Sequence, residues 1–239
     1  MLYCDGHIHI LHGMDTGPAF VEESVTMLRM LQHRGTRRLV LTPHFHADRE
    51  SCSTFIRRRR ERFREFLAAV RAEGLQKPQC ALCAEVDFIP GIAHEASLEK
   101  LLVPHTRYLP IDLPLGSFEK WTMAELAHMM HKRKIYPIVC NLERHLIFSK
   151  EDDLKRLLSL PYTVYQVGLS ALANRKIYRF ILEQTVNGKV FLLGSNAHDP
   201  IKRPPESGRL IDEISALHGE SVLRNLALRT NAFFDQSFS

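Results

Sequence analysis

Short apolar segments rich in β-branched residues alternate with longer amphipathic segments along the whole chain. Of all the features of the sequence, this alternation most restricts which folds are possible. The apolar segments predict strands at residues 3–9, 38–42, 80–87, 107–112, 136–141, 163–168 and 189–194. The amphipathic segments predict helices at residues 19–34, 54–73, 95–102, 122–133, 151–159, 172–187, 206–217 and 219–228. About seven strand–helix units predict an α/β protein with a parallel sheet, and closure into a single-domain barrel is the simplest outcome.

The composition is that of an ordinary globular protein: 45% of the 239 residues are hydrophobic and 25% are charged. No apolar run reaches the roughly 18 residues of a membrane span, and the first residues do not resemble a signal peptide. We therefore expect no membrane span and a cytoplasmic location. The five cysteines include a C-x-x-C pair, Cys80 and Cys83, which apolar neighbours mark as core residues rather than a zinc or redox motif.

A run of arginines lies within "FIRRRRERFREF", residues 55–66, in a chain whose net charge is +5. Apolar residues recur there at helical spacing, which predicts an amphipathic helix with an arginine-rich outer face. That face is either simply solvated or a rim that attracts a phosphorylated or acidic partner. Nucleic acid is not an expected partner, because no aromatic stacking motif accompanies the arginines.

Polar side chains gather where the predicted strands end. The first strand carries His7 and His9, which project from the same face because side chains alternate along a strand. An isolated H-x-H is more typical of partly exposed histidines than of a metal site. Here, however, the other strand ends also carry polar groups: His44, His46, Glu85, Asp87, Asp112, Asn141, Glu143, Arg144, His145, Gln166, Asn196, His198 and Asp199. Such groups are costly to bury unless they bind something, so the pattern predicts a metal site.

Three motifs carry a resemblance to a known family. "DGHIHILHGMDTGP" is similar to D-x-H-x-H-I-L-P-G-x-D-D-G-P, "YPIVCNLERH" to P-x-x-A-H-P-E-R-Y, and "GSNAHDPIKRPP" to A-S-D-A-H-N-x-x-x-R-P-P. These patterns belong to the bacterial manganese-dependent tyrosine phosphatases of the PHP (polymerase and histidinol phosphatase) superfamily, which regulate capsular and exopolysaccharide synthesis. The matches keep their order from residue 3 to about residue 205. The resemblance implies a distorted (β/α)7 TIM-like barrel and a single PHP domain over residues 1–239.

The resemblance also implies roles for individual residues. His7 and His9 correspond to ligands of a first metal ion, and Glu85 corresponds to the carboxylate that bridges it to a second. Asp112 stands where the family has a glutamate for the second ion. The residues that correspond to ligands of a third ion are Asp15, His44 and His198. Arg144 and Arg203 correspond to arginines that grip the phosphate, for which the planar guanidinium is well suited.

Two departures from the family motifs weaken the implied set of metal ligands. Asn141 replaces a histidine ligand of the second ion, and Asn196 replaces an aspartate ligand of the first. A neutral amide is a poorer ligand for first-row metals than an imidazole or a carboxylate. We therefore expect one or two ions rather than three. Manganese is the metal that the resemblance implies, with iron and zinc as alternatives.

The expected function is that of a metal-dependent phosphoesterase: a protein-tyrosine phosphatase in capsule or exopolysaccharide regulation, acting on a phosphorylated protein such as a tyrosine autokinase. We do not expect the chemistry of a cysteine-dependent phosphatase at Cys4, Cys52 or Cys140. One alternative is an enzyme for a small phosphate ester of the histidinol-phosphate type. Another is a weakly active or inactive protein that binds a phosphorylated or acidic ligand. The sequence leaves open whether the chain forms an oligomer.

Overall fold

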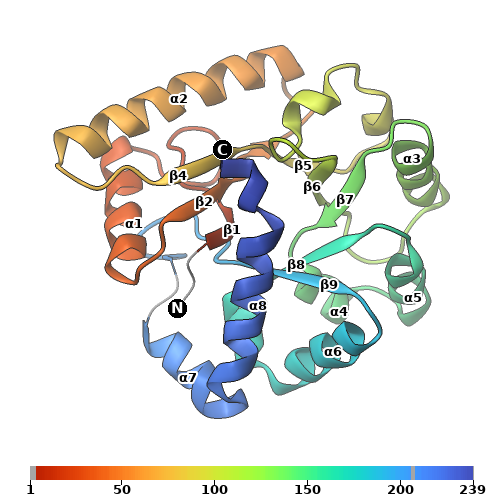
Figure 1. The fold of residues 1–239 in the computed structure, drawn as a ribbon. Helices are drawn as coiled ribbons and strands as arrows, with labels where there is room; N and C mark the ends of the chain where they lie inside the picture. Colours follow the sequence, from red (N-terminus) through yellow and green to blue (C-terminus); the bar gives the residue numbers. More distant parts are fainter. Residues whose placement is uncertain (1–3, 206–207, 239) are drawn as a thin grey trace.

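The computed structural model describes residues 4–205 and 208–238 and consists of parallel strands surrounded by helices (Figure 1). The strands are β1 (Cys4–Ile8), β2 (Arg38–Leu41), β3 (His44–Phe45), β4 (Gln79–Leu82), β5 (Glu85–Asp87), β6 (Tyr108–Asp112), β7 (Tyr136–Val139), β8 (Val164–Gly168) and β9 (Val190–Gly194). The α-helices are α1 (Val21–His33), α2 (Cys52–Ala72), α3 (Lys120–His131), α4 (Leu142–Phe148), α5 (Glu151–Ser159), α6 (Arg175–Val186), α7 (Gly208–His218) and α8 (Glu220–Phe233). Short 3₁₀ helices are η1 (Ile92–His94), η2 (Leu98–Leu101), η3 (Leu169–Ala173) and η4 (Asp235–Phe238).

All strand pairs are parallel and form two sheets, in the orders β1-β2-β4 and β3-β5-β6-β7-β8-β9. The predicted strand over 80–87 is in fact two strands, β4 and β5, and β3 follows β2 beyond Pro43. Each break is the point where the chain passes from one sheet to the other. The expected α/β class is confirmed. Strand pairing within the described residues does not run in one closed ring, although Ile8 and Ala197 bridge the end of β1 to the segment after β9.

Several helices differ from their predicted bounds. The segment 95–102 does not form an α-helix; it contains the 3₁₀ helix η2, and η1 precedes it. Helix α4 was not predicted, because its sequence continues directly from the β7 strand end. Helix α8 extends to Phe233 rather than residue 228, since the side chain of Thr230 accepts a hydrogen bond from the backbone of Leu193 at 2.8 Å. Residues 206 and 207 of the helix predicted over 206–217 lie outside the described residues.

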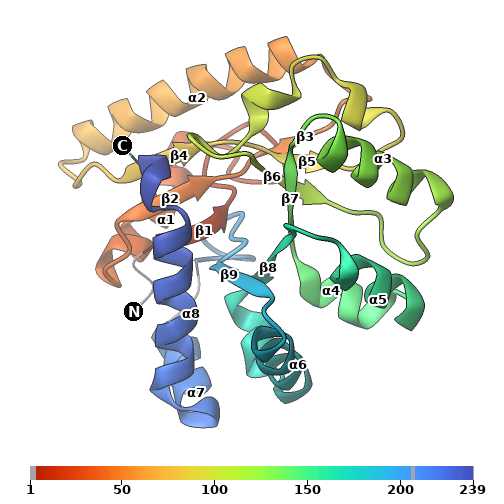
Figure 2. The ribbon, with the colours of Figure 1, turned by 45° about the vertical axis from the view of Figure 1, so that its right-hand side comes forward.

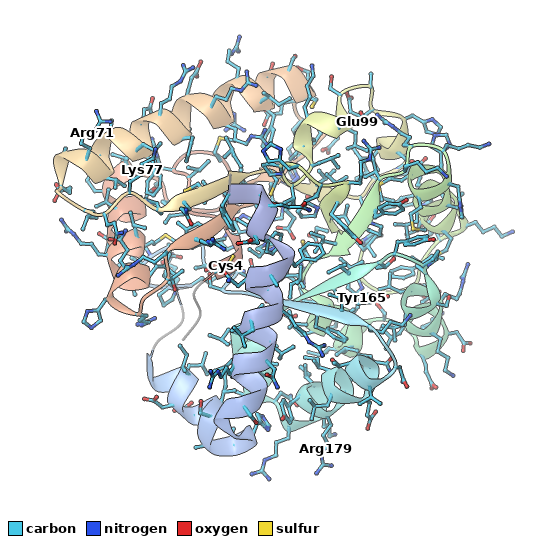
Figure 3. The ribbon with its side chains drawn as sticks, viewed as in Figure 1. Cys4, Arg71, Lys77, Glu99, Tyr165 and Arg179 are labelled. Carbon is cyan, nitrogen blue, oxygen red and sulfur yellow. The ribbon has the colours of Figure 1, made fainter. Side chains whose placement is uncertain are left out.

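The helices lie around the outside of the strands (Figures 1 and 2), and their buried apolar residues belong to the same core as those of the strands. Helix α2 buries Phe55 and Phe66, in agreement with the predicted amphipathic pattern, and packs against α1. Cys83 is buried and free, and Cys80 is also free, as expected for core cysteines. Tyr165 of β8 lies inside the molecule and donates a hydrogen bond to the Leu157 carbonyl at 3.1 Å (Figure 3).

Strands β1 and β9 approach closely at the point where the first polar residues emerge. A Cβ atom on Gly194 would lie 2.5 Å from the Cβ of His7, so only glycine fits at this position. The close approach brings the segment after β9 beside the end of β1. No helix within the described ranges is both long and apolar enough to cross a membrane.

Candidate metal centre

Three imidazoles converge on one carboxylate oxygen at the carboxyl ends of the strands. Glu85 Oε2 lies 3.2 Å from His7 Nε2, 3.2 Å from His9 Nε2 and 3.3 Å from His44 Nε2. The side chains of His7, His9 and Glu85 are at most 1% exposed, and that of His44 is 18% exposed. His7 and His9 lie at the end of β1, whereas His44 and Glu85 begin β3 and β5, shortly after β2 and β4 end. The carboxyl ends of β1, β2 and β4 meet because these strands are parallel neighbours in one sheet.

The donor set fits a metal ion. Glu85 Oε2 is buried without a hydrogen-bond partner, and the Nε2 atoms of His7 and His9 face each other at 2.9 Å. His7, His9 and Glu85 each present one ligand atom within 4.8 Å of the others. Imidazole nitrogen and carboxylate oxygen are the ligands that divalent first-row metals commonly take in proteins. This trio can therefore hold a divalent cation.

A second group of potential ligands shares His9. Its Nδ1 atom lies 2.8 Å from Asp15 Oδ2, and the His198 ring stacks on the His9 ring with centroids 3.9 Å apart. His9, Asp15 and His198 again present ligand atoms within 4.8 Å of one another. Backbone amides of His44 and Gly17 donate to the Asp15 carboxylate at 2.7 and 2.8 Å, which fixes its orientation.

The resemblance grouped His44 with Asp15 and His198, and the His44 imidazole also lies beside Asp87. Its Nδ1 atom faces Asp87 Oδ1 at 3.3 Å, and His46 Nδ1 makes a short contact with the other Asp87 oxygen. His44, His46 and Asp87 form a third group of potential ligands. His46 and Asp87 stood out in the sequence as polar strand-end residues, but the family motifs gave them no role.

The two asparagines lie inside the same network. Asn141 Nδ2 donates to Glu85 Oε1 at 3.3 Å, Asn196 Nδ2 donates to Asn141 Oδ1, and His198 Nε2 lies 3.1 Å from Asn196 Oδ1. Both asparagines have left-handed backbone conformations, with φ of 53° and 51°. Asparagine, aspartate and histidine tolerate this conformation better than most residues. The positions that depart from the family motifs thus point into the candidate metal centre.

Asp112 and the two arginines lie around this network. Arg144 is on α4 and pairs with Asp112 Oδ1 at 3.5 Å, while Arg203 donates to the backbone oxygen of Asn196 at 3.2 Å. Burial raises the pKa of Asp112 to about 6, and the nearby Glu85 acts in the same direction. Burial lowers the pKa of the Arg203 guanidinium, and the positive charge of Arg144 adds to this effect.

A cavity of about 300 Å³ opens beside Arg203. Its lining residues are Glu143, Gly168, Ser170, Ser195, Asn196, Lys202, Arg203 and Pro204. Two cationic side chains and a candidate ligand therefore face one solvent-filled space. A phosphate group bound there would contact an arginine and lie beside the metal centre.

The charges of the centre are strongly coupled. Burial acts to raise the pKa of Glu85, but His7, His9 and His44 outweigh it and hold that pKa well below its ordinary value. Burial acts to lower the pKa of His9, yet Asp15 and Glu85 raise it to about 9. The field therefore favours positive charge between these carboxylates, as a cation site requires.

Residues behind the centre hold it in place. Asp5 accepts hydrogen bonds from the backbone amides of His7 at 3.2 Å and Ser195 at 2.9 Å, which ties β1 to the segment after β9. Thr16 Oγ1 lies 3.0 Å from His198 Nδ1, and Gln166 Oε1 accepts from the Asn141 amide at 2.9 Å. Asp5 and Thr16 belong to the first motif and Gln166 is one of the polar strand-end residues, but neither pattern predicted these supporting roles.

The fold and the site together define a class: α/β proteins whose parallel strands place a histidine–carboxylate metal centre and flanking arginines at one edge. A family model described as "Capsular polysaccharide synthesis, CpsB/CapC" matches residues 3–233. The chain belongs to this CpsB/CapC family of capsular polysaccharide synthesis, which confirms the resemblance found in the sequence.

A solved structure shares the fold. The superposition has a TM-score of 0.72 at 18% sequence identity and covers 95% of this chain and 94% of the other. That chain comes from the crystal structures of YwqE from Bacillus subtilis and CpsB from Streptococcus pneumoniae, described as unique metal-dependent tyrosine phosphatases.

Proposed function

We propose that this protein is a metal-dependent phosphoesterase, specifically a protein-tyrosine phosphatase that acts in capsule or exopolysaccharide synthesis. The observation that carries the proposal is the convergence of three imidazoles on Glu85 Oε2, with Arg144 and Arg203 at the same edge. Membership of the CpsB/CapC family and the fold shared with metal-dependent tyrosine phosphatases support it.

The proposed metal is manganese, with iron and zinc as the alternatives to test, and the proposed number of ions is one or two. His7, His9 and Glu85 would hold one ion, and Asp15 and His198 with His9 or His44 would hold another. The position of the second ion would keep only Glu85 and Asp112 as charged ligands, because Asn141 is neutral, and the first ion would have the neutral Asn196 in place of an aspartate. This difference in ligand strength is the reason to expect fewer than three ions.

When bound, a divalent ion lowers the pKa of a water molecule and neutralises charge on phosphate oxygens. The chain's own contribution is positioning. Arg203, beside the 300 Å³ cavity, would bind phosphate oxygens, and Arg144 would neutralise charge as the phosphoryl group transfers. Asp15 orients His9 through the 2.8 Å contact, and Thr16 orients His198.

The proposed substrate is a phosphotyrosine residue of a phosphorylated protein. A small phosphate ester is the enzyme alternative. A protein that only binds a phosphorylated ligand is the second candidate, and the asparagine pair favours it, because two neutral amides occupy positions of charged or imidazole ligands in the related motifs.

Metal analysis beside turnover tests the proposal. Purified protein is loaded with manganese, iron or zinc, its metal content is measured, and hydrolysis of p-nitrophenyl phosphate and of a phosphotyrosine peptide is followed. We expect at least one bound ion per chain and metal-dependent turnover of both substrates. Glu85→Gln should abolish both, whereas Glu183→Gln, an exposed carboxylate on α6, should change neither. Metal binding without turnover of either substrate would favour the binding protein instead.

We also propose the finer fold assignment. The two parallel sheets would correspond to the two parts of a distorted (β/α)7 barrel of the PHP type, and residues 1–239 would act as one domain. The Ile8–Ala197 bridge, which joins the end of β1 to the segment after β9, supports this interpretation.

A further inference from the structure

The arginine run on α2 divides into two kinds of residue. Arg58 donates to the backbone oxygens of Gly13 at 2.8 Å and Met14 at 3.2 Å and also pairs with Glu50. Arg59 is only 4% exposed, and its guanidinium donates to the carbonyls of Cys83 and Lys100. These two arginines hold the fold together, so the alternative of a simply solvated arginine face does not apply to them.

The other arginines remain outside. Arg57, Arg60 and Arg64 are exposed and lie on one face of α2, because they are three and four residues apart. Together with Lys100 of η2 they line a pocket of about 370 Å³, which we call the α2 pocket. Its other lining residues are Ser53, Ile56 and Glu61.

Positive charge predominates in the α2 pocket. No carboxylate among the described residues lies within ion-pair distance of Arg57, Arg60, Arg64 or Lys100. The neighbouring Arg62, in contrast, pairs with Glu65 at 2.6 Å. Four positive charges around one concave space, with Glu61 as the one acid in the lining, attract an anion.

The α2 pocket is also held in shape. Arg59 Nη2 donates to the backbone oxygen of Lys100 at 3.2 Å, which fixes η2 against α2. The buried arginine beneath the helix therefore places Lys100 beside the exposed arginines. Arg59 is a positioning residue for this pocket, in addition to its role in the core.

We propose that the α2 pocket binds a phosphorylated, acidic segment of the protein substrate at a second position, outside the metal centre. The proposal rests on the proposed phosphatase function and names how its substrate is recruited. Arg58 binds the carbonyls of Gly13 and Met14, which directly precede the candidate ligand Asp15. The helix that carries the α2 pocket thus also contacts the loop that leads into the metal centre.

The chemistry of the pocket favours a phosphopeptide over other anions. Guanidinium groups form bidentate hydrogen bonds with phosphate, and three of them lie in one row. The lining includes no aromatic side chain on which a base of a nucleic acid stacks. None of the large exposed apolar residues in the described parts of the chain is on α2, so the face lacks the groups that insert into a membrane.

A pair of charge-matched variants tests the proposal. The pocket variant is Arg57→Gln/Arg60→Gln/Arg64→Gln. The control is Arg175→Gln/Lys176→Gln/Arg179→Gln, which removes three exposed charges from α6, where Arg179 points away from the molecule (Figure 3). The probe is a peptide with two non-hydrolysable phosphotyrosine analogues several residues apart, and binding to the metal-loaded protein is followed by fluorescence anisotropy.

We expect the pocket variant to weaken peptide binding by about tenfold or more, the scale of losing hydrogen bonds to charged groups. The control should bind as the parent does, and turnover of p-nitrophenyl phosphate should be unchanged in both. Unchanged peptide binding in the pocket variant, or equal weakening in both variants, would overturn the proposal. It would also be overturned if the pocket variant lost binding to anionic vesicles or single-stranded DNA but not to the peptide. A parent that fails to hydrolyse p-nitrophenyl phosphate would refute the phosphatase function alone, because the anisotropy measurement does not depend on turnover.

Discussion

The side chain of Asn196 donates a hydrogen bond to the side chain of Asn141, which joins the segments that follow β9 and β7. Both residues have positive φ angles, 51° for Asn196 and 53° for Asn141. Asn141 in turn donates to Glu85, at the middle of the histidine cluster. A neutral amide pair therefore occupies two positions at which the related motifs carry an aspartate and a histidine.

Restoring those two residues tests what the amide pair does. We expect the double variant Asn141→His/Asn196→Asp to bind one more metal ion than the parent and to hydrolyse p-nitrophenyl phosphate faster. The fold should tolerate it, because histidine and aspartate also accept left-handed backbone conformations. Metal content and turnover are the measurements. Extra metal without faster turnover would indicate a site adapted to another ligand. If the parent hydrolysed p-nitrophenyl phosphate as fast as the double variant, the asparagine amides would be sufficient as ligands for turnover.

The control replaces one of the two residues, Asn141, without supplying a ligand. Asn141→Leu should lower the free energy of unfolding by about 1–3 kcal/mol, since it combines strain at positive φ with the loss of a buried hydrogen-bond network. Chemical denaturation measures this change. If leucine were as stable as histidine at position 141, the backbone argument would be wrong.

Metal binding should stabilise the protein. A ligand at one hundred times its Kd contributes about 2.7 kcal/mol, so manganese should raise Tm measurably. His9→Ala should remove this shift, because His9 belongs to two of the candidate ligand groups. His33→Ala, on the exposed end of α1, is the control and should keep the full shift. A shift that survives His9→Ala would place the ion elsewhere.

Each arginine at the strand edge should contribute to turnover. We expect Arg144→Ala and Arg203→Ala each to reduce kcat/KM by about ten- to a thousand-fold, the scale of losing one positioned electrostatic donor. Arg71→Ala, on the exposed end of α2 in Figure 3, should have no effect. If Arg144→Ala and Arg203→Ala both keep the turnover of the parent, the phosphate is held by other residues.

Stability should depend on pH through His145. This side chain is 1% exposed and lies against Phe118; burial, together with the charge of Arg144, lowers its pKa from 6.5 to about 4. Between these two values the unfolded state binds more protons than the folded state, so stability falls as the pH drops from 6.5 toward 4. From pH 7 to pH 5 this group should remove on the order of 2 kcal/mol, and His145→Gln should reduce the measured loss by that amount. An identical pH dependence in parent and variant would contradict this assignment.

The sequence alone determined the alternation of strands and helices and the polar strand ends, because both follow from local periodicity and from the rule that parallel strands end at one edge. It also pointed to His7, His9 and Glu85, since the strand pattern directs them to one place. It did not determine how the strands divide: the breaks at Pro43 and between β4 and β5 arise where the chain changes sheets.

Tertiary structure alone decided which partners the site residues meet. That Asp87 contacts His44 and His46, that Thr16 supports His198, and that Asn196 bonds Asn141 depend on segments far apart in the sequence. The arginine run shows the same limit. Helical periodicity located the run on one helix, but only packing against Cys83 and η2 separated buried Arg59 from exposed Arg57 and Arg60. Periodicity describes the faces of one element, whereas burial and charge pairing depend on which other elements cover them.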